Sequence, residues 1–152
     1  MALDTQPIID AVVSHALASG HFERVNAHEP QSAPGNGLSA AVWVDAAAPA
    51  RGASGLQATT ARLTLNVRLY TSMLSTPADA IDPRLMAAHD ALMTAYSGDF
   101  TLGGRARCVD LLGMAGVPLS SQAGYLIQDA KQLRVITIVL PVLVNDVWEQ
   151  TP

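Results

Sequence analysis

The stretch RVITIVLPVLVNDVW, residues 134–148, decides the fold because almost every position from 135 to 144 is apolar. A strand that packs one face on a core and shows the other to water alternates apolar and polar residues. Here both alternating sets are largely apolar. One set contains Ile136, Ile138, Leu140, Val142 and Val144, and the other contains Val135, Thr137, Val139, Pro141 and Leu143. Each face of this predicted strand therefore needs something to cover it.

The rest of the chain predicts the elements that could provide a cover. Apolar residues recur at helical spacing in two segments, residues 5–20 after a capping Thr5 and residues 82–98. The second helix is expected to bury a stripe made of Leu85, Met86, Leu92, Met93 and Tyr96. Strand patterns are found at residues 22–25, 38–50, 61–70, 105–114 and 124–129. A tight connection, DAKQ at 129–132, predicts an antiparallel hairpin between the last strands.

Sequential strands with short links favour an antiparallel sheet, and two amphipathic helices can cover one of its faces. The sequence thus predicts an α+β fold, a mainly antiparallel sheet with two helices packed on one face, as a single domain over residues 1–152. No third helix remains for the second face. We therefore expect Val135, Thr137, Val139, Pro141 and Leu143 to lie on an open side, together with Trp43.

An apolar open side has two explanations. Leaving its four large apolar groups in water would cost roughly 1.5 to 3 kcal/mol each relative to burial, so an interface with another chain is the economical one. In the alternative, the strand is central and long loops of the same chain cover its far side. Pro141 cannot donate to a sheet ladder, which predicts that the strand lies at the boundary of the sheet.

Composition excludes several classes of function. Only 14% of the 152 residues are charged, against a typical ~25%, which suggests that part of the surface is covered in the working protein. The net charge is −4 and the arginines are scattered, so a phosphate-binding patch for nucleic acid is not expected. The N-terminus has no signal-peptide pattern, and no apolar run approaches the ~20 residues that span a bilayer. We expect synthesis in the cytoplasm and no membrane partner.

The chemistry-bearing residues do not form a catalytic or metal-binding pattern. His15, His21 and His28 are six and seven residues apart, which places no pair on one helical face. The single cysteine, Cys108, excludes an intrachain disulfide and is expected to be a small buried group rather than a nucleophile. His89 is expected on the second helix with a local partner. No catalytic residue, metal or cofactor is therefore predicted.

Two further features have a structural and a functional interpretation. Asp79 and Asp82 resemble a carboxylate pair, but both are explained as caps of consecutive helical turns. The loop PARGASGLQATT, residues 49–60, is either an ordinary hairpin loop or a segment that becomes ordered when a partner binds, with Arg51 as its charged anchor. The predicted interface residues are Trp43, Arg51, Val135, Thr137, Val139 and Leu143.

The order of the elements resembles that of the tail terminator, or tail-completion, proteins of long-tailed bacteriophages. The resemblance covers most of the chain: an N-terminal helix, the strand ARLTLNVRLY, a helix ending in ALMTAYSGDFTLGG, a further strand, GYLIQD and a long final strand. It includes no catalytic motif. The long loop at residues 27–37 departs from the compact pattern of the family and leaves open which loop would face the tail tube.

The resemblance implies a structural virion protein without enzymatic activity. Such a subunit assembles as a homohexameric ring on the head-proximal end of the tail tube, ends tube polymerisation, and provides the surface on which the head connector or neck protein docks. The genome passes through the ring without specific binding. A head–tail connector is the alternative within this class, and a small ligand-binding or enzyme subunit that dimerises around a pocket is the alternative outside it.

Overall fold

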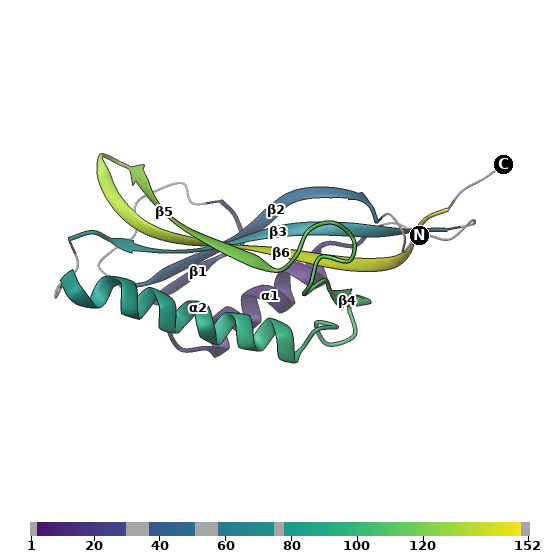
Figure 1. The fold of residues 1–152 in the computed structure, drawn as a ribbon, viewed down its shortest axis with the longest axis horizontal. Helices are drawn as coiled ribbons and strands as arrows, with labels where there is room; N and C mark the ends of the chain where they lie inside the picture. Colours follow the sequence, from purple (N-terminus) through teal and green to yellow (C-terminus); the bar gives the residue numbers. More distant parts are fainter. Residues whose placement is uncertain (1–2, 30–36, 51–57, 75–77, 150–152) are drawn as a thin grey trace.

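The computed structural model describes residues 3–29, 37–50, 58–74 and 78–149, and its fold is the predicted α+β class. Its elements are α1 (Gln6–Ala18), β1 (Arg24–Asn26), β2 (Ser39–Pro49), β3 (Ala58–Ser72), a 3-10 turn (Ala78–Ala80), α2 (Ile81–Gly98), β4 (Cys108–Val109), β5 (Ser120–Gln128) and β6 (Lys131–Glu149). Figure 1 shows both helices on the same side of one long, curled sheet.

The strands follow the order β1-β2-β3-β6, and β4 and β5 share the remaining edge of β6. Every pair is antiparallel except β1 with β2, which is parallel. The predicted hairpin at 129–132 is confirmed, since β5 and β6 pair from Ser120 opposite Val139 to Gln128 opposite Lys131. Asp129 and Ala130 form its tight turn with positive φ angles of 52° and 60°.

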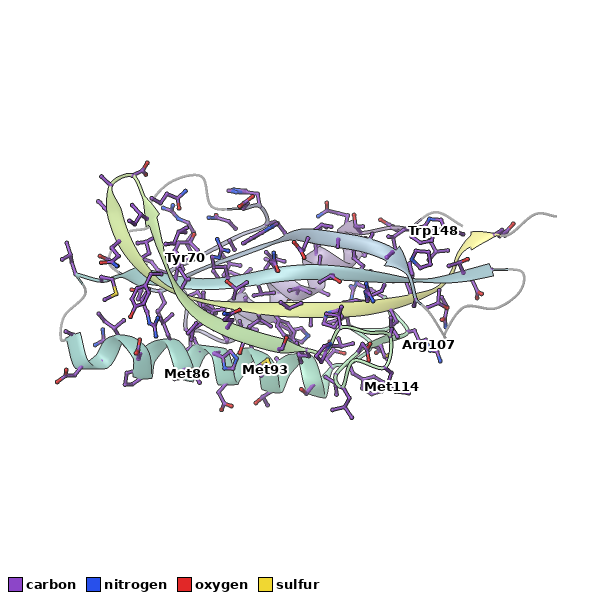
Figure 2. All side chains as sticks on the ribbon, turned by 45° about the horizontal axis from the view of Figure 1, so that its top comes forward. Tyr70, Met86, Met93, Arg107, Met114 and Trp148 are labelled. Atoms are coloured by element: carbon purple, nitrogen blue, oxygen red, sulfur yellow. The ribbon has the colours of Figure 1, made fainter. Side chains whose placement is uncertain are left out.

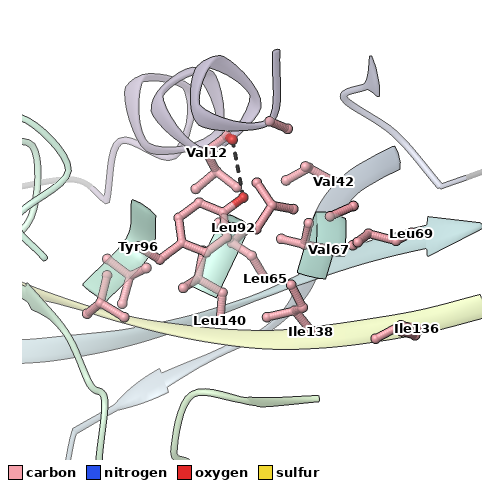
Figure 3. Packing of buried hydrophobic residues seen from close by; sticks show 14 of the residues in the cluster. Val12, Val42, Leu65, Val67, Leu69, Leu92, Tyr96, Ile136, Ile138 and Leu140 are labelled. Atoms are coloured by element: carbon pink, nitrogen blue, oxygen red, sulfur yellow. Dashed lines mark hydrogen bonds between the residues drawn. The ribbon is translucent and has the colours of Figure 1, made fainter. Parts of the chain in front are cut away.

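The core lies between the sheet and the helices (Figure 3). Leu65 of β3 and Leu140 of β6 are register partners, and both are completely buried there. Tyr96 of α2 crosses this core, and its hydroxyl donates a hydrogen bond to the Val12 carbonyl of α1 at 3.3 Å. The predicted phase of the final strand is confirmed, because the set that packs on the helices is Ile136, Ile138, Leu140, Val142 and, partly buried, Val144.

Pro141 does not mark the boundary of the sheet, so that prediction is wrong. β6 pairs with β3 along one side and with β4 and β5 along the other. The Asp110 amide donates to the Pro141 carbonyl at 2.9 Å, which shows that the backbone groups of Pro141 point toward β4 and β5. The β4 ladder starts at Val142 and the β5 ladder ends at Val139. Pro141 therefore lies opposite the gap between β5 and β4, and its lack of an N–H removes no hydrogen bond from either ladder.

The predicted strand at residues 105–114 is mostly a loop, because only Cys108–Val109 pairs with β6. Gly103, Gly104 and Gly113 adopt positive φ angles around this short strand, which an extended ladder cannot include. Residues 110–119 then form an ordered loop between β4 and β5.

The second helix also differs in detail from its predicted stripe. Met86 is 52% exposed, while Ile81 and Ala88 are buried in its place. Asp82 does not cap the helix, because the N-cap is Ala80 and no side chain caps that end. The carboxylate of Asp82 instead accepts a hydrogen bond from Arg134 Nε at 2.9 Å.

Candidate interaction surface

We call the sheet surface opposite the helices the open face. Trp43 of β2, Asn66 of β3 and Val139 of β6 form one row across it, since each is the register partner of the next. The predicted placement of Trp43 beside the alternate residues of the final strand is therefore correct. The open face has three parts, and the chain itself covers two of them.

At one end of the open face, the curl of the sheet brings side chains together. Tyr70 and Val135 are register partners, and both belong to a small cluster with Leu133 and Ala41. Val135 is only 6% exposed. Figure 1 shows the β5–β6 hairpin bending away from the helices here, so the open face is concave at this end. A predicted interface residue, Val135, is thus already covered within the chain.

At the other end, the loop of residues 110–119 lies over the sheet. Leu143 is 6% exposed because it packs with Ala115 of this loop and with Ala50. Cys108 lies at the margin of the same cluster, half-buried, and burial raises the pKa of its thiol. A raised pKa keeps the thiol protonated, which agrees with a packing role rather than a nucleophilic one. The alternative explanation, cover by a loop of the same chain, therefore holds for Leu143.

Between these ends lies a half-exposed strip, the central strip, made of Trp43, Asn66, Arg68, Thr137 and Val139. The Arg68 guanidinium lies over the Trp43 ring at 5.1 Å from its centroid, and Arg68 Nε donates to Thr137 Oγ1 at 3.1 Å. These contacts hold the Arg68 side chain over the sheet, where β3 and β6 are each paired with a strand on both sides. The central strip is thus an ordered, largely uncharged surface, and it contains three of the predicted interface residues.

Sequence reasoning missed the loop of residues 110–119, which we call the apolar loop. Asp110 is buried, and its carboxylate accepts hydrogen bonds from the Met114 and Ala115 amides at 2.9 and 2.8 Å. Arg62 Nη1 donates to the Ala115 carbonyl at 2.6 Å. Although the backbone is held this firmly, Leu112 is 89% exposed and Met114 is 90% exposed. The signal in the sequence was an Asp before two Gly residues in DLLGMAGVP.

A second unpredicted feature is a pocket of about 300 Å³ under the β5–β6 hairpin, which we call the hairpin pocket. Arg134 crosses it, paired with Asp82 and placed 4.5 Å from the centroid of the Tyr125 ring. The hairpin bends away from the start of α2, and this bend opens the space. The lining residues are Met73, Ala78, Asp79, Ile81, Asp82, Tyr125 and Arg134.

The histidines of the helices have structural partners. His15 Nε2 donates to Asp99 Oδ2 at 2.8 Å, which ties α1 to the end of α2. The Gly103 amide and His15 together lower the pKa of Asp99. His89 Nε2 lies 2.7 Å from Ser121 Oγ of β5, a partner from another element rather than a local one, and burial lowers the pKa of its imidazole. Within the described residues, no three His, Cys, Asp or Glu side chains are grouped as metal ligands.

Arg51, the remaining predicted interface residue, lies outside the described residues. In the part of the chain that the structure describes, neither helix is long and apolar enough to cross a membrane.

Comparison with known proteins finds similarity among solved structures but not among sequences. No family model and no curated protein sequence matches the chain. Among solved structures, a chain of the "virion of native gene transfer agent (GTA) particle" is similar at 15% sequence identity and a TM-score of 0.41. The match covers 91% of this chain and 94% of that chain.

Proposed function

We propose that the protein is a structural virion subunit that assembles with copies of itself into a ring on the head-proximal end of a phage tail tube. Residues 1–152 act as one domain in this proposal. The order of helices and strands, which resembles that of tail terminators, supports it. The observation that carries it is the central strip, an ordered surface that the described part of the chain leaves half-exposed.

The central strip has the composition of a protein interface. Aromatic and Arg side chains are enriched at the centres of interfaces, and Trp43 stacked under Arg68 provides both. Because these side chains are already ordered, little rotamer freedom is lost when a partner covers them. In the proposed ring, Trp43, Thr137 and Val139 contact a neighbouring subunit or a tail component. Val135 and Leu143 support the strip from within the chain at its two ends.

The proposed role is mechanical rather than catalytic. The ring ends polymerisation of the tail tube protein and offers its other side to the head connector or neck protein. Arg51 stays part of the proposed contact surface. The net charge of −4 supports a lumen through which DNA slides without specific binding. The assembled protein is part of the virion, and its assembly takes place in the host cytoplasm.

Native mass spectrometry and negative-stain electron microscopy of the purified protein test this proposal. A closed ring of identical subunits, which then caps one end of tail tubes assembled in vitro and stops their growth, is the expected result. A stable monomer or dimer at micromolar concentration would contradict the ring. A ring that binds isolated head connectors but leaves tube growth unchanged would replace the terminator role with a connector role.

A further inference from the structure

We propose that subunits of the ring join head to tail, with the apolar loop of one copy inserted into the hairpin pocket of the next copy. This inference rests on the proposed ring function and names the two surfaces that make its repeated contact. The occupant of the pocket is a second copy of this chain.

The apolar loop is built to hold its shape before any partner binds. An added Cβ at Gly113, whose φ is 75°, would come within 2.9 Å of the Pro118 backbone nitrogen. Gly116 has a φ of 107° and lies against Arg62, so both glycines are required by the path of the backbone. The two Asp110 bonds and the Arg62 bond fix the remaining backbone. A rigid loop that presents Leu112 and Met114 to solvent is a preformed anchor for a concave partner.

The hairpin pocket offers a matching concave surface. Met73, Ile81 and Tyr125 give it apolar walls, and exposed Leu74 and Ile127 lie close to these residues in the sequence. The Asp82–Arg134 pair and the Tyr125 ring hold one another in place across the pocket. Two apolar side chains of the size of Leu112 and Met114 could therefore enter the pocket without displacing a helix or a strand.

Charge also favours this pairing. The pocket is lined by two carboxylates, Asp79 and Asp82, and one guanidinium, Arg134. The apolar loop has no exposed charge of its own, and the exposed Arg107 lies just before β4, with its amide donating to the Leu143 carbonyl of β6 at 2.8 Å. Figure 2 shows Arg107 and Met114 at the same end of the molecule. An arginine beside the loop would thus approach a pocket with an excess of negative charge.

The two surfaces lie at opposite ends of the sheet. Arg134 at the pocket and Pro141 beside the loop are seven residues apart along β6 (141 − 134), which is about 23 Å at the rise of a strand. A contact between two different surfaces is heterologous, and repeated heterologous contacts close into a ring when the rotation per subunit allows it. Self-pairing of either surface would instead stop at a two-fold dimer.

A mixing experiment tests the direction of the contact. One variant carries Leu112→Asp with Met114→Asp, which disables the loop, and another carries Ala78→Glu with Tyr125→Asp, which disables the pocket. All four positions are exposed, so each monomer should keep the circular dichroism spectrum of the wild type. Each variant alone should run as a monomer. Their mixture should form a dimer and nothing larger, because only one intact loop and one intact pocket can meet.

The control is Leu17→Asp, an exposed apolar position of α1 outside both surfaces, which should leave the ring intact. Rings that form from either variant alone would overturn this inference and leave the proposed function standing. A mixture that stays monomeric while the wild type forms rings would also overturn it. A wild type that is itself monomeric would overturn the proposed function.

Discussion

The two faces of the sheet differ although β6 supplies apolar side chains to both. The helix face is one continuous cluster that contains nineteen buried hydrophobic residues among those described. On the open face, two clusters of four and three buried residues lie at the ends, separated by the central strip. Apolar content alone therefore does not identify a core. A face becomes core where other elements of the chain reach it, and its uncovered remainder is available to a partner.

The largest effect should come from the helix face. Leu65→Ala removes a completely buried side chain between β3 and the helices, and we expect it to lower the free energy of unfolding by about 2–5 kcal/mol in urea titrations. Asn66→Ala, the adjacent residue on the open face, is the matched control and should cost well under half as much. Equal losses would mean that the central strip is packed like a core.

The next largest loss of stability is expected at the end of the open face that the apolar loop covers. Asp110→Ala leaves the Met114 and Ala115 amides without their acceptor, and an unsatisfied buried donor costs roughly 1–3 kcal/mol. Thermal unfolding should show this loss, and limited proteolysis should cut residues 110–119 faster. Asp110→Asn keeps one side-chain acceptor and should be less damaging. If both substitutions leave the cleavage rate unchanged, Asp110 does not anchor the loop.

A smaller effect on stability is expected from substitution of Asp99, which ties α1 to the end of α2. Its pKa is lowered in the folded state by the Gly103 amide and by His15, so its carboxylate stabilises the fold above the ordinary pKa. This contribution is lost as pH falls from about 4 through the lowered value. Asp99→Asn should flatten the dependence of unfolding free energy on pH in that window. The same slope in both proteins would contradict this assignment.

The sequence was sufficient for the fold class and for the phase of the final strand. Alternation in residues 61–70 is clear, so Leu65 must face the core, and the paired strand must present Leu140 beside it. The position of Trp43 on the open face follows from the same two-residue period. These predictions succeeded because the side-chain period of a strand is a local property.

The prediction for Pro141 failed because its environment depends on tertiary structure. A proline fits inside this sheet only because β4 and β5 share one edge and leave a gap opposite it. The apolar loop was not predicted for the same reason, since its shape depends on the distant contact from Arg62 to Ala115 as well as on the local bonds of Asp110. The hairpin pocket depends on the bend of β5 and β6. The alternation of apolar and polar residues along a strand does not predict such a bend.

The central claim is that the central strip is an interface between chains, and Val139→Asp tests it most directly. The charge lies on the half-exposed open face, so the variant should keep the circular dichroism spectrum and nearly the thermal stability of the wild type. Native mass spectrometry and tube-capping assays should show rings that stop tube growth for the wild type and for the similarly shaped control Val139→Thr, and no such capping rings for Val139→Asp. A Val139→Asp protein that still forms rings and still caps tail tubes, or one that unfolds, would contradict the claim.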